Sequence, residues 1–509
     1  MLLAELTDTS NRVAQRSGRL AKVAELAELL GRTSAHETEI AVAFLTGELR
    51  QRQIGVGYRS LRDLPGPAES PSLTLTAVDD AFARIKATTG AGSVGARREV
   101  LAELFGHATA DERSFLVRLL SGELRQGALD GVMVDAIAKA TGIPAASVRR
   151  AHMLRGSLIE VAAAALDGGR AALDAYRLAV GHPLSPMLAA SAPDVPAALA
   201  KVRPAGVEWK LDGVRVQVHR DGSDVAVYTR SLDDITTRVP ELVDAARTLP
   251  VPAFVLDGEA IALRQDDRPQ PFQVTAARTG STADVASVRD RTPLRAFFFD
   301  VLHLDGEDLL DVPLRDRYTA LDGFLPGDLR VARTITDSVE TAAEFFADAV
   351  ERGHEGVVVK ALDAPYAAGR RGSGWIKVKP RHTLDLVVLA AEWGHGRRQG
   401  WLSNLHLGAR DPESGEYVML GKTFKGLTDA LLTWQTEKLL ALATTPADRW
   451  TVRVRPELVV EIAFDGVQRS SRYPGGLALR FARVLRYRTD KRADEADTFG
   501  TVRALAAAE

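Results

Sequence analysis

Lysine is scarce in this chain of 509 residues, so the positions of its lysines are informative. Of 65 basic side chains only 12 are lysines, and arginine supplies the rest of the positive charge. Arginine stays protonated in proteins, whereas a buried lysine can lose its proton and act as a nucleophile or a base. Lys210 lies in the sequence Lys-Leu-Asp-Gly, immediately before an alternating stretch. We therefore take Lys210 as the first candidate nucleophile.

A lysine amine has to be neutral before it can attack phosphorus. At its ordinary pKa of about 10.4 the amine is almost wholly protonated at neutral pH. Neighbouring positive charge and partial desolvation lower that pKa and free the lone pair. Arg215, Lys377, Lys379 and a bound metal are the candidate sources of that charge.

The composition excludes several classes of protein. The chain has no cysteine, which removes disulfides, zinc fingers, thiol catalysis and iron–sulfur clusters. Hydrophobic residues make up 46% and charged residues 26%, as in ordinary globular domains. No apolar run reaches the length of a membrane span, and the N-terminus lacks a signal-peptide pattern, so we expect a cytoplasmic protein with no membrane partner.

The length and the change of pattern along the chain predict about three domains. Residues 1–190 show apolar residues at helical spacing, and "TADE" at 109–112 is a capping box that opens a helix. A Pro-rich stretch begins at Gly181 and is interpreted as a linker. Alternating segments then indicate strands mixed with helices. The predicted fold class is an all-α domain (1–190), a linker (191–204), an α+β domain (205–383) and a C-terminal β-barrel of OB-fold type (384–509).

The helical region contains an internal repeat. Gly-Glu-Leu-Arg-Gln occurs at 47–51 and again at 122–126, and each copy is interpreted as a helix end, a glycine turn and a new helix. Two interpretations stay open for these turns. They are a duplicated packing unit, or they offer backbone N–H groups and an arginine to phosphates.

Seven motifs occur in a fixed order over roughly 280 residues. Together they resemble the motifs of the covalent nucleotidyltransferases, and among these the ATP-dependent DNA ligases of bacterial and archaeal type with a helical DNA-binding domain. The motifs are KLDGVR (210–215), TRSLDDIT from Thr229, LDGEAI (256–261), FFDVLHLDG from Phe298, EGVVVK (355–360), WIKVKP (375–380) and LRFARVLRYRTDKR (479–492).

The resemblance implies an α+β adenylation domain in which Lys210 attacks the α-phosphate of ATP. The products are a lysyl-AMP phosphoramidate and pyrophosphate. The same resemblance implies that Mg²⁺, which prefers oxygen ligands, assists the reaction. The implied contacts are Glu208 with the adenine edge, Phe299 with the adenine face, Arg230 and Glu259 with the ribose, Arg215, Lys377, Lys379 and Arg371 with nucleotide phosphates, Arg488 and Lys491 with pyrophosphate, and Glu355 and Asp212 with the metal.

Some of these assignments have structural alternatives. Phe299 lies in an apolar strand, where a buried aromatic side chain is the ordinary case. Asp212 either contacts the metal or only shapes the turn that presents Lys210. Arg370 adjoins Arg371, and either of the two could be the nucleotide contact. Isolated histidines such as His219 show no metal-ligand spacing and are interpreted as structural.

Net charge is −2, so any nucleic-acid binding must use local basic patches. Residues 451–492 hold ten arginines and lysines against four acidic residues, and residues 369–381 hold five basic residues and no acidic one. These patches suit the phosphate backbone of nicked double-stranded DNA. We therefore expect a monomeric DNA ligase that seals nicks in repair, replication or recombination.

Three other functions remain alternatives. An RNA-capping guanylyltransferase or an RNA ligase shares the lysine chemistry but does not ordinarily carry a long helical N-terminal domain. A non-catalytic nick-binding clamp would have lost the nucleophile or its partner lysines, and all of them are present. An NAD⁺-dependent DNA ligase is disfavoured because that class has a cysteine-ligated zinc module.

Overall fold

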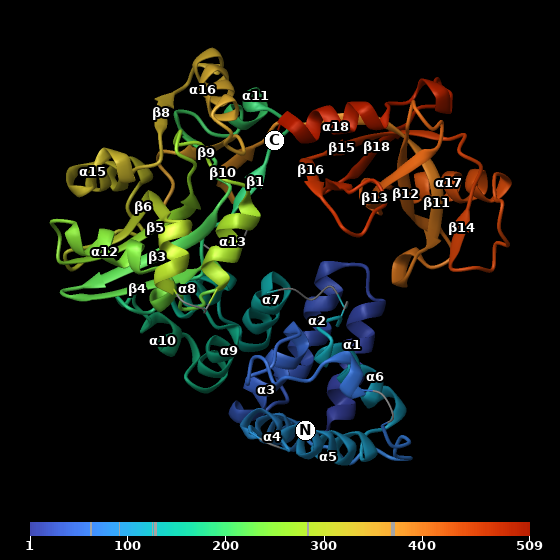
Figure 1. Ribbon diagram of the computed structural model, residues 1–509. Helices are drawn as coiled ribbons and strands as arrows, with labels where there is room; N and C mark the ends of the chain where they lie inside the picture. The colour runs from blue at the N-terminus through green and yellow to red at the C-terminus, as the bar shows by residue number, and fades with distance from the viewer. Residues whose placement is uncertain are drawn as a thin grey trace. The chain divides into compact units, whose positions relative to one another are not determined.

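The structure is a computed structural model that describes residues 1–61, 64–90, 92–124, 126, 130–281, 285–367 and 372–508. The chain divides into two compact units. The first comprises Met1–Phe345 and Val358–Lys377, and the second comprises Phe346–Val357 and Val378–Glu509. In chain order an all-α region is followed by an α+β region and then by a strand-rich region, as the sequence predicts (Figure 1).

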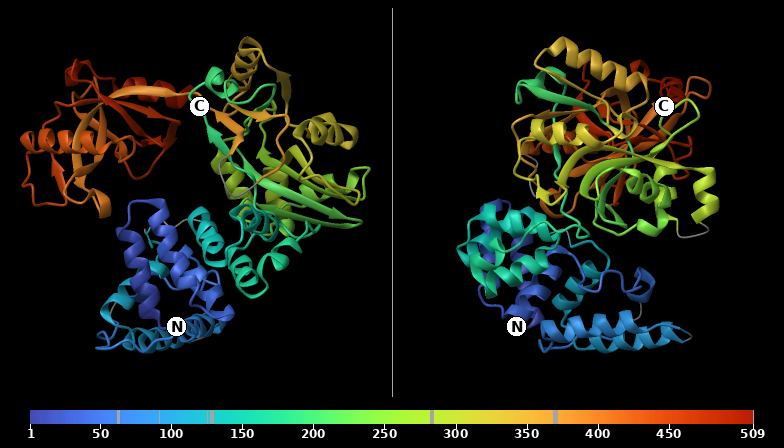
Figure 2. Two further views of the ribbon diagram at one scale, coloured as in Figure 1. Left: turned by 180° about the vertical axis from the view of Figure 1, so that it is seen from behind. Right: turned by 90° about the vertical axis from the view of Figure 1, so that its left-hand side faces the viewer.

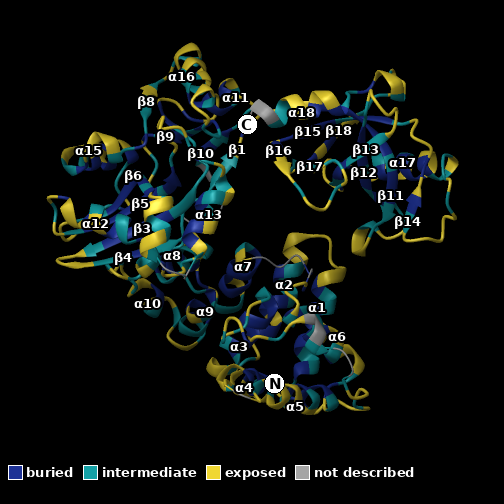
Figure 3. Ribbon diagram, viewed as in Figure 1, coloured by how far each residue is buried: buried dark blue, intermediate teal, exposed yellow. Residues whose placement is uncertain are grey.

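The N-terminal helices enclose one apolar core. Leu3 and Leu6, Phe44 and Phe82 are fully buried in it, and the two phenylalanine rings meet edge to face at 5.8 Å. In Figure 3 the outer faces of α4 and α5 are exposed while the faces toward the core are buried. The helices are α1 (Leu3–Gln15), α2 (Arg19–Leu30), α3 (Ala35–Thr46), α4 (Leu75–Ala87), α5 (Ser93–Gly106), α6 (Ala110–Leu120), α7 (Asp130–Thr141), α8 (Ala145–Arg155), α9 (Leu158–Asp167) and α10 (Gly169–Asp174).

The predicted capping box is present at the start of α6. The hydroxyl of Thr109 accepts from the backbone N–H of Glu112, and the Glu112 carboxylate accepts in return from the backbone N–H of Thr109 at 2.8 Å. Such reciprocal bonds satisfy donors that the first helical turn leaves without partners. The sequence therefore located this helix start correctly.

The two repeated turns share one backbone geometry. Gly47 and Gly122 both adopt positive φ, and the following residue, Glu48 or Glu123, bonds back to a carbonyl inside the preceding helix. This is the glycine-terminated helix end that the repeat predicts. No helix follows the first copy directly, which differs from the prediction. Arg125 of the second copy lies outside the described residues.

Contacts of both copies favour the interpretation of the repeat as a packing unit. Arg50 forms ion pairs with Glu39 at 2.9 Å and with Asp79 at 2.8 Å. The side chain of Gln126 in the second copy is buried, and it donates to the carbonyl of Leu45 in α3. These residues hold helices together.

The α+β region is built on two five-stranded sheets. Their strand orders are β1-β10-β9-β2-β8 and β4-β3-β5-β6-β7. The first sheet comprises β1 (Ala189–Ser191), β2 (Ala205–Trp209), β8 (Arg333–Thr336), β9 (Val357–Ala361) and β10 (Gly372–Val378). The second comprises β3 (Val214–Asp221), β4 (Asp224–Thr229), β5 (Ala253–Ala262), β6 (Leu294–Leu304) and β7 (Glu307–Asp308).

Helices cover one face of the second sheet. Val216 and Leu256 pack there with Leu242 of α12 and Leu321 of α15. The helices of this region are α11 (Val195–Leu199), α12 (Pro240–Thr248), α13 (Phe272–Gly280), α14 (Val285–Arg291), α15 (Leu314–Phe324) and α16 (Val339–Glu351). Figure 2 shows the region from two further sides.

The other face of this sheet is also buried, although the sequence places polar residues on it. Gln217 and His219 are 2% and 1% exposed. The Gln217 amide exchanges hydrogen bonds with the backbone of Leu184, at 3.0 and 2.6 Å, and Gly181 N–H donates to the His219 ring at 3.1 Å. The Pro-rich segment interpreted as a linker is thus packed across the sheet, and the stretch from Gly181 to residue 204 includes β1 and α11. His219 is structural, as expected, and burial lowers its pKa to about 3.

The strand-rich region contains a sheet of order β13-β12-β11-β15-β18, with β14 paired to β11. Its strands are β11 (His382–Trp393), β12 (Leu402–Arg410), β13 (Tyr417–Thr423), β14 (Thr451–Arg453), β15 (Val459–Phe464), β16 (Gly466–Arg469), β17 (Leu477–Arg480) and β18 (Arg483–Tyr487). Its helices are α17 (Asp429–Ala441) and α18 (Phe499–Ala508), which follows the last strand. Leu432 and Leu439 of α17 and Phe499 of α18 complete the apolar core of the sheet.

None of the helices in the described part of the chain has the length and apolar character needed to span a bilayer.

One fully buried ion pair holds β6 to α15. Arg317 donates to both oxygens of Asp300, at 2.7 and 3.0 Å, and both side chains are inaccessible to solvent. Arg317 also donates to the carbonyls of Val312 and Ala364. Removing one partner of such a pair leaves the other charge buried without compensation.

We predict that Arg317→Ala lowers the free energy of unfolding by about 3–5 kcal/mol, because Asp300 is left buried and unpaired. Arg330→Ala is the matched control, since Arg330 pairs with Asp322 near the surface and should cost at most about 1 kcal/mol. Thermal and urea unfolding of both variants measures the difference. Equal losses in the two variants would contradict the assignment.

Candidate nucleotide-binding site

Lys210 lies where the chain crosses from one sheet to the other. β2 belongs to the first sheet and β3 to the second, and residues 210–213 connect them. The connection is tight, because a Cβ atom on Gly213 would lie 3.0 Å from Cγ of Glu259 and still closer to the backbone of Ala260. Only glycine allows this approach. The Lys-Leu-Asp-Gly motif therefore brings Lys210 against the edge of β5.

Glu259 is the acidic neighbour of Lys210 in this arrangement. It lies opposite Arg215 in the β3–β5 register, and the backbone N–H of Gly213 donates to its carboxylate. Burial raises the pKa of Glu259 to about 7, although the charges of Lys210 and Arg215 oppose that shift. Two residues expected at the nucleotide, Lys210 and Glu259, are thus brought together.

Arg215 is held by a buried carboxylate. Its guanidinium donates to both oxygens of Asp257, at 3.0 and 2.7 Å, and also to the carbonyl of Met187 at 2.6 Å. The hydroxyl of Tyr366 donates to Asp257 at 2.7 Å and accepts from Arg215 at 3.2 Å. Burial opposes the charge, but Asp257 more than offsets it and the pKa of Arg215 is raised. Arg215 therefore links β3 to Asp257 on β5 and to the backbone of Met187.

An aromatic cluster lies over these charged groups. The ring of Trp375 meets Phe299 and Tyr366 edge to face, with centroids at 5.7 and 5.9 Å. The guanidinium of Arg215 lies 5.5 Å from the centroids of Phe299 and Trp375. The Nζ atom of Lys360 lies 4.4 and 4.2 Å from the same two centroids. Two cations thus fix the orientation of the Phe299 ring.

The orientation of Phe299 depends on a β-bulge. Asp257 pairs with Asp300, whereas the next residue, Gly258, pairs with Phe298, so Phe299 is the extra residue of β6. A bulge redirects a side chain relative to the regular alternation of a strand. Phe299 is partly exposed, while Phe298 beside it is 3% exposed and belongs to the sheet core.

Glu208 lies below the aromatic cluster and both of its oxygens have partners. Tyr318 donates to Oε1 at 2.6 Å, and Lys360 lies 2.5 Å from Oε2. Gly206 allows this contact, because a Cβ there would lie 2.8 Å from the Tyr318 hydroxyl. Burial raises the pKa of Glu208, although Lys360 opposes the shift.

Sequence reasoning missed the residues that support the site. Asp257 could have been found, because it lies two positions before Glu259 and therefore on the same face of β5. Tyr318 and Tyr366 lie outside the quoted motifs and carry no local signal. Trp375 lies inside a motif but was not predicted to support the site; it is 4% exposed.

The structure also gives the positions of the other residues of the first unit that the sequence predicts at the nucleotide or the metal. Lys377 lies on β10, opposite Ser191 of β1. Arg230 is exposed at the end of β4, and Asp212 is partly buried in the turn after Lys210. Arg371, together with its alternative Arg370, lies outside the described residues.

In the second unit the predicted metal ligand Glu355 forms an ion pair with Lys379. Lys379 also lies 3.1 Å from Asp465. Burial opposes the charge of Lys379, but the two carboxylates outweigh it and raise its pKa. In the part of the chain that the structure describes, no three His, Cys, Asp or Glu side chains are grouped to hold a metal ion. Single carboxylates such as Glu355 fit Mg²⁺, which is commonly held by one or two carboxylates together with substrate phosphates and water.

Asp385 holds the two C-terminal cations that the last motif predicts. Its Oδ2 accepts from Arg488 at 2.7 Å and from Lys491 at 2.6 Å. Arg488 also pairs with Asp490, and these carboxylates raise its pKa. The motif therefore presents two neighbouring cations that share one carboxylate.

Comparisons of this chain with family models and with known proteins all find DNA ligases. Family models match residues 58–138 as "DNA ligase N terminus", 186–379 as "ATP dependent DNA ligase domain" and 398–491 as "ATP dependent DNA ligase C terminal region". A "Probable DNA ligase" of Beutenbergia cavernae is 60% identical over 99% of this chain and 100% of the relative. One of Mycobacterium marinum is 58% identical over 99% of this chain and 100% of the relative.

The solved structure named "Pmar-Lig_PreS3" has the same fold. It aligns with a TM-score of 0.62 and 18% identity, covering 95% of this chain and 99% of that one. The predicted fold class is therefore confirmed: a helical N-terminal region, a nucleotidyltransferase domain and a strand-rich C-terminal domain. With full-length relatives near 60% identity and matches to all three family models, the chain belongs to the ATP-dependent DNA ligases.

Proposed function

We propose that this enzyme seals nicks in duplex DNA by way of AMP carried on Lys210. The observation that carries the proposal is the position of Lys210. It adjoins Glu259 at the crossing between two sheets, and the fixed ring of Phe299 projects from the neighbouring strand β6. A nucleophile, a group for the ribose and a stacking surface for the base thus come from adjacent strands.

The proposed reaction has three balanced steps. Nζ of Lys210 gives up a proton and attacks the α-phosphorus of ATP, so that a P–N bond forms and the P–O bond to pyrophosphate breaks. An oxygen of the DNA 5′-phosphate then attacks the same phosphorus, breaks the P–N bond and returns the amine. Finally the 3′-OH attacks the 5′-phosphorus, and AMP leaves as the phosphodiester forms. Each step transfers a phosphoryl group, so positioning and charge supply most of the catalysis.

The first unit would hold the nucleoside. The adenine ring stacks on Phe299, the carboxylate of Glu259 accepts from a ribose hydroxyl, and Arg230 donates to the ribose. Glu208 has both carboxylate oxygens occupied by Tyr318 and Lys360, so we propose that its backbone contacts the adenine edge. Arg215 acts by positioning, because its guanidinium faces Asp257 and Met187.

Lysines would stabilise the charge that grows on the phosphates. Lys377 and Lys379 contact the α-phosphate, and Arg371 contacts the nucleotide phosphates. Glu355 would hold Mg²⁺ with the nucleotide, and Asp212 either joins it or shapes the turn. The metal supplies positive charge to the phosphoryl oxygens when it is bound. Lys379 is then released from Glu355 to a phosphate oxygen.

Arg488 and Lys491 would hold the leaving pyrophosphate. Asp385 keeps the two cations side by side before the nucleotide arrives. The proposed DNA substrate is a nicked duplex bound by a monomer through its basic patches, and the proposed location is the cytoplasm. The residue ranges 1–190, 205–383 and 384–509 remain our proposed domain boundaries.

We predict that Lys210→Ala abolishes self-adenylation. Wild-type protein incubated with α-labelled ATP and Mg²⁺, without DNA, should give a labelled band on a denaturing gel, and the variant should give none. Lys201→Ala is the matched control, since this lysine lies outside the motifs. Label obtained only from GTP or NAD⁺, or label that persists in Lys210→Ala, would contradict the proposal.

We predict that Arg488→Ala with Lys491→Ala slows self-adenylation by about a hundredfold, because the leaving pyrophosphate loses its cations. Sealing of a pre-adenylated nick, which releases no pyrophosphate, should fall much less. Arg486→Ala is the matched control, since Arg486 lies on the neighbouring strand β18 and pairs with Glu461. Equal losses of the double variant in both assays would rule out the pyrophosphate role.

We predict that Glu259→Gln stabilises the nucleotide-free protein relative to wild type as pH rises. The pKa of Glu259 is raised to about 7, so folding favours its protonated form. Wild type therefore loses stability between the unfolded pKa near 4.5 and about 7, whereas the glutamine variant has no such loss. Melting temperatures of both proteins from pH 4.5 to 8 measure this. A difference that does not change with pH would show that Glu259 is ionised throughout.

A further inference from the structure

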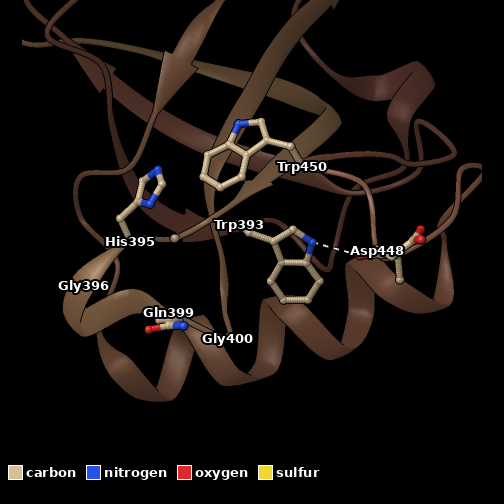
Figure 4. A pocket seen from close by; sticks show the side chains of 9 residues that line it. Trp393, His395, Gly396, Gln399, Gly400, Asp448 and Trp450 are labelled. Carbon is tan, nitrogen blue, oxygen red and sulfur yellow. Dashed lines mark hydrogen bonds between the residues drawn. The ribbon is translucent and has the colours of Figure 1, made fainter. Parts of the chain in front are cut away.

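A second aromatic site lies in the strand-rich unit, within the loops that follow β11 and precede β14. It is a pocket of about 500 Å³ lined by Trp393, Gly394, His395, Gly396, Gln399, Gly400, Ala447, Asp448 and Trp450 (Figure 4). None of these residues belongs to the ligase motifs. Its aromatic walls come from two segments that are more than fifty residues apart in the sequence.

The walls of the pocket are fixed by hydrogen bonds. Trp393 donates from its indole nitrogen to the carbonyl of Ala447 at 2.9 Å, and from its backbone to the carbonyl of Trp450 at 3.3 Å. Gly394 N–H donates to the carbonyl of Trp401 at 2.8 Å. A Cβ on Gly394 would lie 2.6 Å from Cβ of Arg398, so only glycine fits where this loop folds back on itself.

Trp450 supplies an exposed aromatic ring to the pocket. Its ring stacks on the ring of His395, with centroids 4.6 Å apart and planes at 30°. Half of the Trp450 side chain nevertheless remains accessible to solvent. A large aromatic side chain left half exposed and supported from behind by another ring offers a stacking surface to a planar ligand.

The loops that form the pocket carry more basic than acidic residues, although the charged residue among those that line it is Asp448. Arg397 and Arg398 lie in the short helical turn Gly396–Arg398, and Arg449 precedes Trp450, whereas Asp448 is the only acidic residue in these loops. Arg398 donates to the carbonyl of Phe424 and keeps its charge, while Arg397 pairs with Asp429 at an exposed position. Asp448 lies at the opposite end of the pocket from His395 in Figure 4.

We propose that this pocket binds an unpaired base of single-stranded DNA. The base stacks on Trp450, its edge meets the amide of Gln399, which can both donate and accept, and the adjoining phosphates meet the arginines. Stacking on an aromatic face tolerates any base, so the site would read strandedness rather than sequence. The inference rests on the proposed DNA substrate but is independent of the lysine chemistry. It gives the enzyme a contact for an unpaired strand outside the catalytic site.

The test compares two labelled oligomers of about ten nucleotides, an oligodeoxythymidylate and an abasic strand of equal length. Fluorescence anisotropy with the full chain gives Kd for wild type, Trp450→Ala and Trp450→Phe. We expect Trp450→Ala to weaken binding of the thymidylate on the order of tenfold, and Trp450→Phe to retain most of it. The abasic strand should bind equally weakly to all three proteins, because it has no base to stack.

Each contrary result overturns the inference. An unchanged Kd for Trp450→Ala, or an equal loss on the abasic strand, would exclude base stacking. A trimethyl-lysine peptide that binds in a Trp450-dependent manner, while the thymidylate does not, would make the pocket a cation site instead. Photocrosslinking of an iodouracil oligomer, followed by peptide mapping, should identify Trp450 or His395, and crosslinks confined to other segments would count against the pocket.

Self-adenylation separates this inference from the proposed function. Trp450→Ala should label with ATP as wild type does, which also shows that the variant is folded. If wild type fails to label while thymidylate binding still depends on Trp450, the lysine chemistry is wrong and the pocket stands. If labelling is normal and thymidylate binding does not depend on Trp450, only the pocket is wrong.

Discussion

The buried pair of Arg215 and Asp257 is the interaction on which the site depends. It ties β3 to β5, and through Met187 it also ties the Pro-rich segment to the sheet. Tyr366 completes the network and packs against Trp375, which in turn orients Phe299. A fully paired network of this kind fixes one arrangement, while removal of one partner leaves a buried charge and is strongly destabilising. The nucleotide site is therefore built before the nucleotide arrives.

Each of the two units contains charged groups that we propose to act in the reaction. In the first, Lys360 and Glu208 lie under the aromatic cluster as a second buried pair. In the second, Asp385 gathers Arg488 and Lys491, and Glu355 with Asp465 holds Lys379. Cations that the reaction needs at phosphates are thus paired with carboxylates in the nucleotide-free protein. Phosphate groups would have to replace those carboxylates, so binding of the anion exchanges one set of ion pairs for another.

Much of the fold follows from the sequence because its signals are local. The capping box at Thr109, the glycine ends of α3 and α6, and the alternation of β3 each depend on a few neighbouring residues. The nucleophile motif was also readable, since Gly213 must be glycine where the chain meets β5. The polar side chains of Gln217 and His219 on β3 gave no sign that the Pro-rich segment covers that face. That contact joins residues about 35 positions apart and has no periodic signature. The β-bulge at Phe299 and the supporting role of Tyr318 are equally non-local, because they are set by strand register and by helix packing.

The central claim is that Lys210 becomes covalently bound to AMP. Tandem mass spectrometry of the wild-type protein after incubation with ATP and Mg²⁺, with acid avoided during digestion because phosphoramidates are labile to it, tests this claim most directly. We expect one adenylated peptide, modified at Lys210, and its disappearance when nicked DNA is added. Adenylation at another lysine, or a modification at Lys210 that nicked DNA does not remove, would contradict the claim.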